Sequence, residues 1–149
     1  MIVIVDTNIL FSACITAEKQ SKISEILFRK QQTFKRISCQ FAVEELFLHR
    51  NKLIKASKLP PDKLDVLLHE TLKQIVFYSE DTIASQHWNE ADRLTKDVDH
   101  KDIAFVALTL QTDGILWTGD KKLSEHLKVL GFDRVVNTVE LSVLLNIKL

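Results

Sequence analysis

Apolar residues in this chain occur in two patterns, short runs and longer stretches with helical spacing. Residues 2–5 form an unbroken β-branched run, which is typical of a strand buried on both faces. The segments 34–38, 76–78, 115–118 and 134–136 are further strand candidates. Helical spacing of apolar residues predicts a helix after Asp6 and others at about 18–32, 40–57, 61–75, 80–94, 102–111, 121–130 and 139–145.

Strands that alternate with helices predict a parallel sheet covered on both faces, because crossovers between parallel strands are right-handed and usually helical. We therefore expect an α/β fold of three layers, α/β/α, around a central parallel sheet of four to five strands. No linker or internal repeat interrupts residues 1–149, which predicts a single domain. Pro61 and Asp62 suit the first turn of a helix, and Gly131 suits the position just after one.

Composition agrees with a globular protein but says little about partners. Hydrophobic residues make up 46% of 149 positions, with three Gly and two Pro, which excludes a disordered or fibrous chain. The formal net charge is zero, so the field of the whole chain gives no reason to expect a polyanionic partner, and any binding of nucleic acid must be local. Basic residues in the first half could form either a rim that grips a phosphate backbone or an ordinary solvated surface: Arg29, Lys30, Lys35, Arg36, Arg50, Lys52, Lys55 and Lys58.

The first apolar run is too short for a secretory signal or a membrane span. It stops at Asp6, and no segment of about 20 apolar residues follows. We therefore expect a cytoplasmic protein with no membrane partner. Cys14 and Cys39 form no CxxC pair and fall in a helix and at a strand end, so we expect two buried free thiols.

Several acidic residues follow expected strands or lie near the start of expected helices. Asp6 comes directly after the first strand, and Asp120 directly after the strand at 115–118. Asp102 opens the buried helix that leads to that later strand, and Glu45 lies in the helix after the second strand. Since parallel strands share one carboxyl edge, where ligands bind in such sheets, we expect these acids to share a pocket.

Each of these acids also has a purely structural explanation. Asp6, Asp99 and Asp120 stand where N-caps occur, and Asp102 suits the positive end of a helix dipole. Capping is the better explanation for any one of them alone. Only their joint arrangement favours a functional site.

Four short motifs follow one another in a characteristic order and spacing. They are Val5-Asp6-Thr7-Asn8, then Glu44-Glu45-Leu46, then Asp102 before Ala104, Ala107 and Leu108, and finally Thr118-Gly119-Asp120. Each motif is weak alone. Together they resemble the PIN domain, the nuclease fold of VapC-type toxins in toxin–antitoxin pairs, and the resemblance covers almost the whole chain.

The resemblance implies an acidic catalytic site with metal ligands and polar supports. Its expected catalytic and metal-binding members are Asp6, Glu45, Asp102 and Asp120, with Asp99 as a further metal ligand and Asn8 and Thr118 as supports of Asp6 and the strand end.

Two of these positions have competitors in the sequence. Helical periodicity leaves Glu44 and Glu45 undecided, and the resemblance favours Glu45 because the family's glutamate precedes a leucine. Asp102 is preferred to Asp97 and Asp99 because of its spacing to the two alanines that follow it. The pair that follows the glutamate, His49-Arg50, also resembles a PIN subgroup.

The resemblance further implies an activity and partners. PIN toxins are metal-dependent, so we expect an Mg²⁺- or Mn²⁺-dependent endoribonuclease that hydrolyses RNA phosphodiester bonds. PIN domains commonly form homodimers, and the toxins among them are inhibited by a small antitoxin protein. Phe11 and Phe28 could contribute to a dimer face, but core packing is the expected role of both.

The chemistry of clustered carboxylates is consistent with a hard divalent cation. Two like charges about 4 Å apart repel by about 4 kcal/mol at an effective dielectric constant near 20, so such a cluster needs a proton or a cation. Oxygen ligands without sulfur or imidazole suit Mg²⁺ or Mn²⁺. No histidine has a zinc-binding spacing, and we expect His100 to be a solvent-exposed loop residue and Trp117 to pack in the core.

Two other functions stay open at the level of sequence. One is a catalytically inactive PIN-like module that binds RNA or protein, which the intact set of acids disfavours. The other is an acidic α/β pocket with different chemistry, such as a phosphotransfer receiver or a Mg²⁺ phosphatase. A receiver needs a lysine after a late strand and the phosphatase an Asp-x-Asp step, whereas this chain has Asp6-Thr7-Asn8.

Overall fold

The five strands of the protein form one parallel sheet in the order β3-β2-β1-β4-β5. The structure is a computed structural model, and it describes residues 1–16, 21–30 and 33–147. The strands are β1 (Ile2–Val5), β2 (Lys35–Cys39), β3 (Val76–Tyr78), β4 (Ile115–Trp117) and β5 (Val135–Val136). The prediction of a parallel α/β sheet is confirmed.

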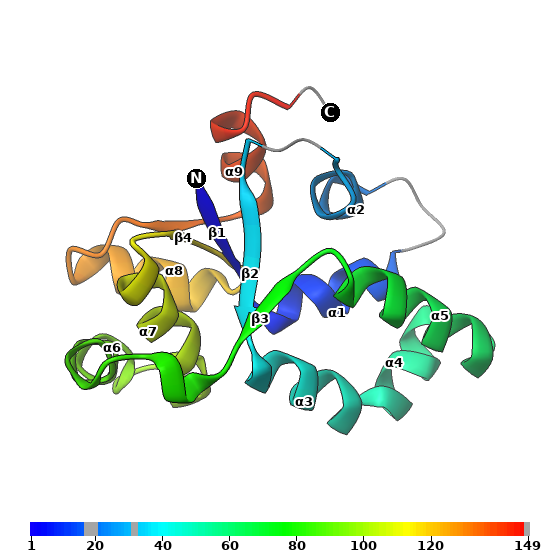
Figure 1. Ribbon diagram of the computed structural model, residues 1–149, viewed down its shortest axis with the longest axis horizontal. Coiled ribbons are helices and arrows are strands. Elements are labelled where there is room, and N and C mark those ends of the chain that lie inside the picture. The colour runs from blue at the N-terminus through cyan, green and yellow to red at the C-terminus, as the bar shows by residue number, and fades with distance from the viewer. Residues whose placement is uncertain (17–20, 31–32, 148–149) are drawn as a thin grey trace.

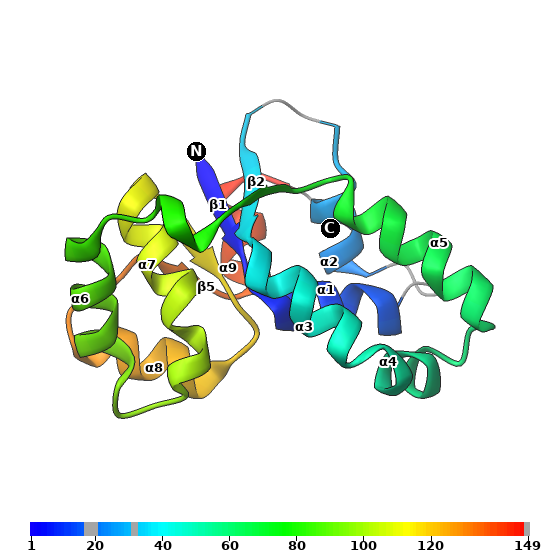
Figure 2. The same ribbon diagram turned by 60° about the horizontal axis from the view of Figure 1, so that its bottom comes forward.

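Helices cover both faces of this sheet. They are α1 (Thr7–Ile15), α2 (Lys22–Leu27), α3 (Gln40–Leu48), α4 (Arg50–Ser57), α5 (Pro61–Leu72), α6 (Ser85–Thr95), α7 (Ile103–Thr112), α8 (Lys121–Val129) and α9 (Thr138–Leu144), with 3₁₀ turns η1 (Glu80–Thr82) and η2 (His100–Asp102). Figure 1 shows α6, α7 and α8 on one side of the strands and α1 to α5 on the other, and Figure 2 shows the same division after rotation. The expected three layers are therefore present.

The core lies where the central strands meet α7. Val3, Ile4 and Val5 of β1 are fully buried, and every residue from Ala104 to Thr109 of α7 is buried. This helix contacts β1, β2 and β4, so it covers the middle of the sheet. An apolar helix in that position fixes where its N-terminus, and hence Asp102, stands relative to the strand ends.

The expected continuous helix over 40–57 is wrong, because the helix breaks at His49. That residue leaves helical geometry with φ −101° and ψ 21° and separates α3 from α4. Leu46 in α3 and Leu53 in α4 are both buried in the core, whereas Phe47 is 58% exposed. The spacing of apolar residues across the break is compatible with one helix or two, so the sequence pattern could not reveal it.

Two other helices differ from expectation. Within the described residues, the helix expected at 18–32 is only Lys22–Leu27; positions 17–20 and 31–32 lie outside the described residues. It ends where the Arg36 guanidinium donates hydrogen bonds to the carbonyls of Ile26 and Arg29, each at 3.0 Å. The helix expected from residue 80 begins later, because Glu80–Thr82 is a separate 3₁₀ turn.

Several residue-level expectations are confirmed. Cys14 and Cys39 are buried free thiols, and burial raises the pKa of their thiols to about 11 and about 12. Trp117 is fully buried, with its indole N–H donated to Thr138 at 3.0 Å. Phe11 and Phe28 both pack against the core. Every helix among the described residues is too short or too polar to span a bilayer.

Candidate active site at the carboxyl edge of the sheet

The order of the strands creates a switch point beside β1. From β1 the chain moves outward through β2 to β3, and β4 and β5 then lie on the other side of β1. Asp6 follows β1, and Asp120 comes shortly after β4. The strands β1 and β4 are direct neighbours in the sheet. Because the crossover helices diverge at such a point, parallel sheets form their ligand crevices there.

A cavity of about 340 Å³ lies at this point and gathers the predicted acids. Its lining residues are Asp6, Thr7, Asn8, Phe11, Ser12, Glu45, His49, Lys52, Asp99, Lys101, Asp102 and Asp120. The structure therefore brings all five predicted acids into one cavity, together with Asn8. Thr118 does not line the cavity, but its hydroxyl is hydrogen-bonded to the Asp6 carboxylate.

Asp6 is the most buried of these carboxylates, with 3% of its surface exposed. Its Oδ2 accepts hydrogen bonds from the hydroxyl of Thr118 at 2.8 Å and from the side-chain amide of Asn8 at 3.3 Å. The pKa of the Asp6 carboxyl is raised to about 6, mainly by burial and in smaller part by the charges of Glu45 and Asp120, against the lowering effect of the hydrogen bonds from the Thr118 hydroxyl and the Asn8 backbone N–H. The side chain also caps α1 weakly, since the Asn8 backbone N–H lies 3.5 Å away.

Asn8 and Thr118 connect the ends of β1 and β4. The Asn8 amide donates to the Thr118 hydroxyl at 3.1 Å, and the Asn8 carbonyl oxygen accepts from the backbone N–H of Gly119 at 2.9 Å. The Thr118 hydroxyl also accepts from the backbone N–H of Asp120 at 3.1 Å. Both residues are thus placed to orient Asp6 and Asp120, in agreement with the positions expected for supports.

Glu45 reaches the cavity from α3, and its neighbour does not. The Glu45 carboxylate accepts a hydrogen bond from the Thr7 hydroxyl at 2.7 Å, whereas Glu44 is exposed and absent from the lining. Of the two glutamates that helical periodicity left undecided, it is therefore Glu45 that lines the cavity; its role as a ligand stays a prediction. The role of Thr7 was missed at the sequence level, although its position directly after Asp6 at the start of α1 was a usable signal.

Asp102 differs from the other acids because its carboxylate does not cap a helix. It precedes α7 but makes no side-chain capping bond, and none of the described residues donates a hydrogen bond to it. The pKa of the Asp102 carboxyl is raised to about 8. The main cause is burial, and the charges of the four other acids contribute the rest: Asp6, Asp99, Asp120 and Glu45. Capping therefore does not explain this half-buried acid.

Asp99 and Asp120 combine capping with exposure to the cavity. Asp99 accepts a hydrogen bond from the backbone N–H of Lys101 at 3.0 Å, and Asp120 accepts one from Leu123 at 3.0 Å. In each case the bond uses one carboxylate oxygen, so the second oxygen can serve a ligand. Asp97 is exposed and absent from the lining, which removes it from the competition for the third acidic position.

The oxygen atoms of the acidic side chains are the kind of ligand that a hard divalent cation prefers, but their present positions do not form a metal site. Five of the lining residues carry carboxylates, and burial together with the neighbouring acids raises the pKa values of Asp6 and Asp102, so a cation in the cavity would favour their ionised forms. Among the described residues, however, no group of three or more His, Cys, Asp or Glu side chains is arranged to hold a metal ion as it stands.

Residues outside the four motifs complete the cavity. Phe11 and Ser12 come from α1, His49 from the break between α3 and α4, and Lys101 from η2. Of these, only His49 had a signal in the sequence, as part of the His49-Arg50 pair; the others reach the site through packing of the helices and no local pattern marks them. His100, by contrast, is exposed and its imidazole lies 2.8 Å from Asp92, as expected for a loop histidine.

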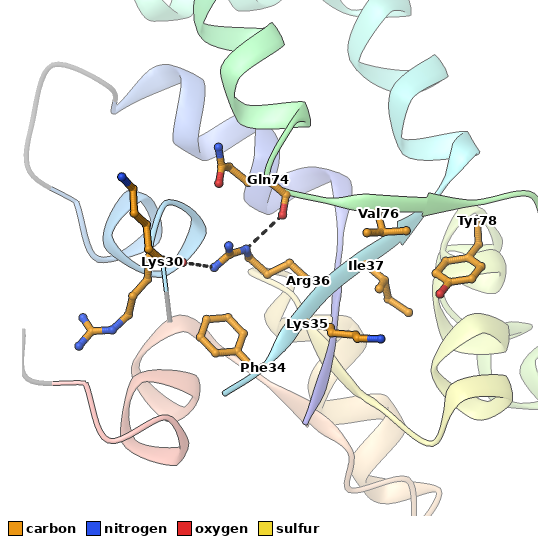
Figure 3. A pocket seen from close by; sticks show the side chains of 9 residues that line it. Lys30, Phe34, Lys35, Arg36, Ile37, Gln74, Val76 and Tyr78 are labelled. Atoms are coloured by element: carbon orange, nitrogen blue, oxygen red, sulfur yellow. Dashed lines mark hydrogen bonds between the residues drawn. The ribbon is translucent and has the colours of Figure 1, made fainter. Parts of the chain in front are cut away.

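A second cavity, of about 520 Å³, lies at the opposite end of β2 (Figure 3). None of its lining residues in the described chain is acidic, and Lys30, Lys35 and Arg36 are among them. Figure 3 shows the Arg36 guanidinium bonded to backbone carbonyls, including that of Gln74 at 3.2 Å. This arginine, part of the basic group of the first half, therefore joins α2, β2 and the segment before β3, away from the acids.

The fold and the site together define a parallel α/β protein with an acidic pocket at its topological switch point. Sequence comparison then gives the family. A family model described as PIN domain matches residues 4–140, so the chain belongs to the PIN domain family. PIN domains are generally nucleases.

A solved structure agrees with this assignment. A chain in the crystal structure of VapBC2 from Rickettsia felis bound to a DNA fragment from their promoter superposes with a TM-score of 0.68. The two chains are 13% identical, and the match covers 92% of this chain and 98% of that one. This similarity shows a common fold. A search of curated protein sequences gives no match.

Proposed function

We propose that this chain is an Mg²⁺- or Mn²⁺-dependent endoribonuclease that hydrolyses RNA phosphodiester bonds, within a single domain spanning residues 1–149. The observation that carries the proposal is Asp102. A half-buried carboxylate beside four other acids, with a pKa of about 8 and no hydrogen-bond donor among the described residues, is an unfavourable arrangement for stability alone. A bound cation removes the repulsion, and membership of the PIN family makes nucleic acid the natural substrate.

The residues divide into ligands and supports. Asp6 and Asp120 are the proposed principal ligands, Glu45 and Asp102 complete the shell directly or through water, and Asp99 is a further candidate. When bound, a divalent ion supplies Lewis-acid chemistry, since it polarises a phosphoryl oxygen and acidifies an attacking water.

The supports fix how these ligands are presented. Thr118 and Asn8 hold the Asp6 carboxylate in one orientation, and the Thr7 hydroxyl does the same for Glu45. Asn8 follows β1 and Thr118 follows β4, and the two side chains are hydrogen-bonded to each other. They therefore also fix the position of Asp6 relative to Asp120. Such orientation lowers the cost of arranging the ligands when the ion binds.

Cleavage assays with paired variants of one loop test the proposal. Asp102→Asn should lower RNA cleavage by at least two orders of magnitude in Mg²⁺ or Mn²⁺, because it removes a carboxylate from the site. Asp97→Asn, an exposed acid five residues away that does not line the cavity, is the matched control and should retain wild-type activity. Equal activity of the two variants, or cleavage that persists after removal of divalent ions, would contradict the proposal.

A toxin role within a toxin–antitoxin pair is the proposed biological setting. It is supported by the family and by the fold shared with a chain of VapBC2, a complex solved bound to a DNA fragment from its promoter. The proposed partners are therefore RNA as substrate, a small antitoxin protein and a second copy of the chain. Expression of the wild type should arrest growth of the host cell, and Asp6→Asn should relieve that arrest; arrest by both proteins would exclude a nuclease toxin.

The alternative is a catalytically inactive PIN-like module that binds RNA or protein. The absence, among the described residues, of a ready-made metal-ligand group is the observation that favours it. It predicts that wild type and Asp6→Asn bind RNA equally and that neither cleaves it with any divalent ion. Direct measurement of Mn²⁺ binding separates the two functions, since only the nuclease requires an affinity that is lost in Asp6→Asn.

A further inference from the structure

The acidic cavity also carries cations on its wall. Lys52 and Lys101 both line it. The eight basic residues noted in the first half of the chain all lie in described segments, and Lys52 is the only one of them that lines this cavity. Arg50, two residues before Lys52, instead makes hydrogen bonds of 2.9 and 2.8 Å to Asp65 and joins α4 to α5. The basic half of the chain is therefore not a uniform surface, because one of its lysines is placed at the site.

We propose that Lys52 and Lys101 bind the phosphates on either side of the phosphodiester that is cleaved, so that the substrate is a polynucleotide strand and not a small phosphate ester. This inference rests on the proposed function of the cavity. It assigns binding roles to two residues outside the acidic motifs.

Lys52 is held at the cavity by an aromatic ring. The helix break at His49 starts α4 in a new direction, and this places Lys52 in its first turn beside α1. The Lys52 ammonium lies 5.7 Å from the centroid of the Phe11 ring, which also lines the cavity. An aromatic face positions an ammonium without neutralising its charge. Within the described residues no carboxylate forms an ion pair with Lys52.

Lys101 approaches from the other helical layer. It belongs to η2, which contacts α6 and α7, whereas α4 packs with α1 and α5 on the opposite side of the sheet. Asp99 fixes the backbone of this turn by accepting the Lys101 N–H, while the side chain of Lys101 is exposed. No ion pair to its ammonium occurs in the described part of the chain.

The two lysines therefore reach the acidic cavity from opposite helical layers, and neither ammonium forms an ion pair within the described residues. An ion held by the acids takes one phosphate of the strand, and the phosphates before and after it then meet a negative cavity that would repel them. A lysine on each side offsets that repulsion for the adjoining phosphates and adds a salt-dependent contribution to affinity. A mononucleotide gains little affinity from this arrangement, because it has no second phosphodiester phosphate for the other lysine to bind.

Salt titrations of RNA binding test the inference. Asp6→Asn, which removes a proposed ligand with little change in shape, serves as the parent protein, and a single-stranded RNA oligonucleotide is titrated at several salt concentrations by fluorescence anisotropy. Lys52→Gln and Lys101→Gln should each weaken binding several-fold at low salt and reduce the slope of log affinity against log salt by about 0.7, the value for one phosphate contact on a single strand. Lys52→Arg, which keeps the charge, should restore most of the affinity.

Matched lysines away from the cavity provide the controls. Lys55 lies on the same helix as Lys52, and Lys96 follows α6 near η2; both are exposed and neither lines the cavity. Their Gln variants should keep the slope of the parent. If all four Gln variants lose slope equally, the lysines act only through general charge and the inference is wrong, even where the wild type cleaves RNA. If the slopes change as expected but the wild type never cleaves, the proposed nuclease function fails while the two lysine contacts stand.

Discussion

Asp102 and Asp120 both precede a helix, yet only Asp120 caps one. From the sequence, capping was the better explanation for each acid alone, and it is confirmed for Asp6, Asp99 and Asp120. The sequence identified acids that share one cavity, because the four aspartates stand next to strand ends or helix starts and the family resemblance added Glu45. It could not separate capping from exposure to a cavity, since that difference depends on side-chain orientation.

The raised pKa of Asp102 predicts how stability depends on pH. The folded protein holds the Asp102 proton up to about pH 8, whereas the unfolded chain releases it near the ordinary value of 3.8. The stability that this proton contributes is complete below about pH 4 and is lost as pH rises through 8. In metal-free buffer, Asp102→Asn should therefore match wild type near pH 4 and unfold several degrees higher at pH 8.

Thermal unfolding followed by circular dichroism in the presence of a chelator provides this measurement. Asp97→Asn is the control and should follow the wild-type curve across the same range, because its side chain is exposed outside the cavity. A constant offset between Asp102→Asn and wild type at all pH values would mean that the Asp102 carboxyl is not perturbed.

Among the elements, the strands were easier to predict than the helix boundaries. All five strand positions agree with the expected segments, because β-branched and apolar runs bounded by polar residues have few other interpretations. The ends of helices depend on contacts that are distant in sequence. Arg36 binds the carbonyl of Ile26 in the last turn of α2 and that of Arg29 just beyond it. Glu80 completes the start of α3, where the N-cap residue Cys39 makes no side-chain bond.

Removal of Glu80 should destabilise the protein through α3. Its carboxylate accepts the backbone N–H of Phe41 at 2.6 Å, a capping contact supplied from 39 residues away. Glu80→Ala should cost about 1 kcal/mol, as for loss of an N-cap. The free energy of unfolding in urea measures this, with exposed Asp81 changed to Ala as the neighbouring control. Equal losses for both variants would show that the capping contact contributes nothing specific.

For the whole molecule, the sheet order is what joins the acids. Asp6 and Asp120 follow neighbouring strands, so the parallel-sheet prediction was sufficient to bring them together. Glu45 and Lys52 depend on how α3 and α4 pack against α1, and the sequence pattern gives no direct measure of that packing. The gathering of the acids could therefore be predicted from the sequence, whereas the position of Lys52 and Lys101 at the cavity was seen only in the structure.

Divalent ions should stabilise the whole fold, because the proposed ligands come from segments spread between residues 6 and 120. An ion that binds only the folded chain raises its stability by RT ln(1 + [L]/Kd), which is about 2.7 kcal/mol at a hundredfold excess over Kd. The melting temperature of wild type should rise with Mn²⁺ concentration, and that of Asp6→Asn should rise much less. Differential scanning fluorimetry measures both, and parallel shifts in the two proteins would indicate binding elsewhere.

The hydrogen bond between Asp6 and Thr118 spans 112 residues of sequence. During translation Asp6 is therefore made long before the Thr118 hydroxyl that orients its carboxylate. A nascent polypeptide that stops before Thr118 lacks both this hydroxyl and Asp120, so its acidic pocket is incomplete. The pocket thus forms only after synthesis has passed residue 120.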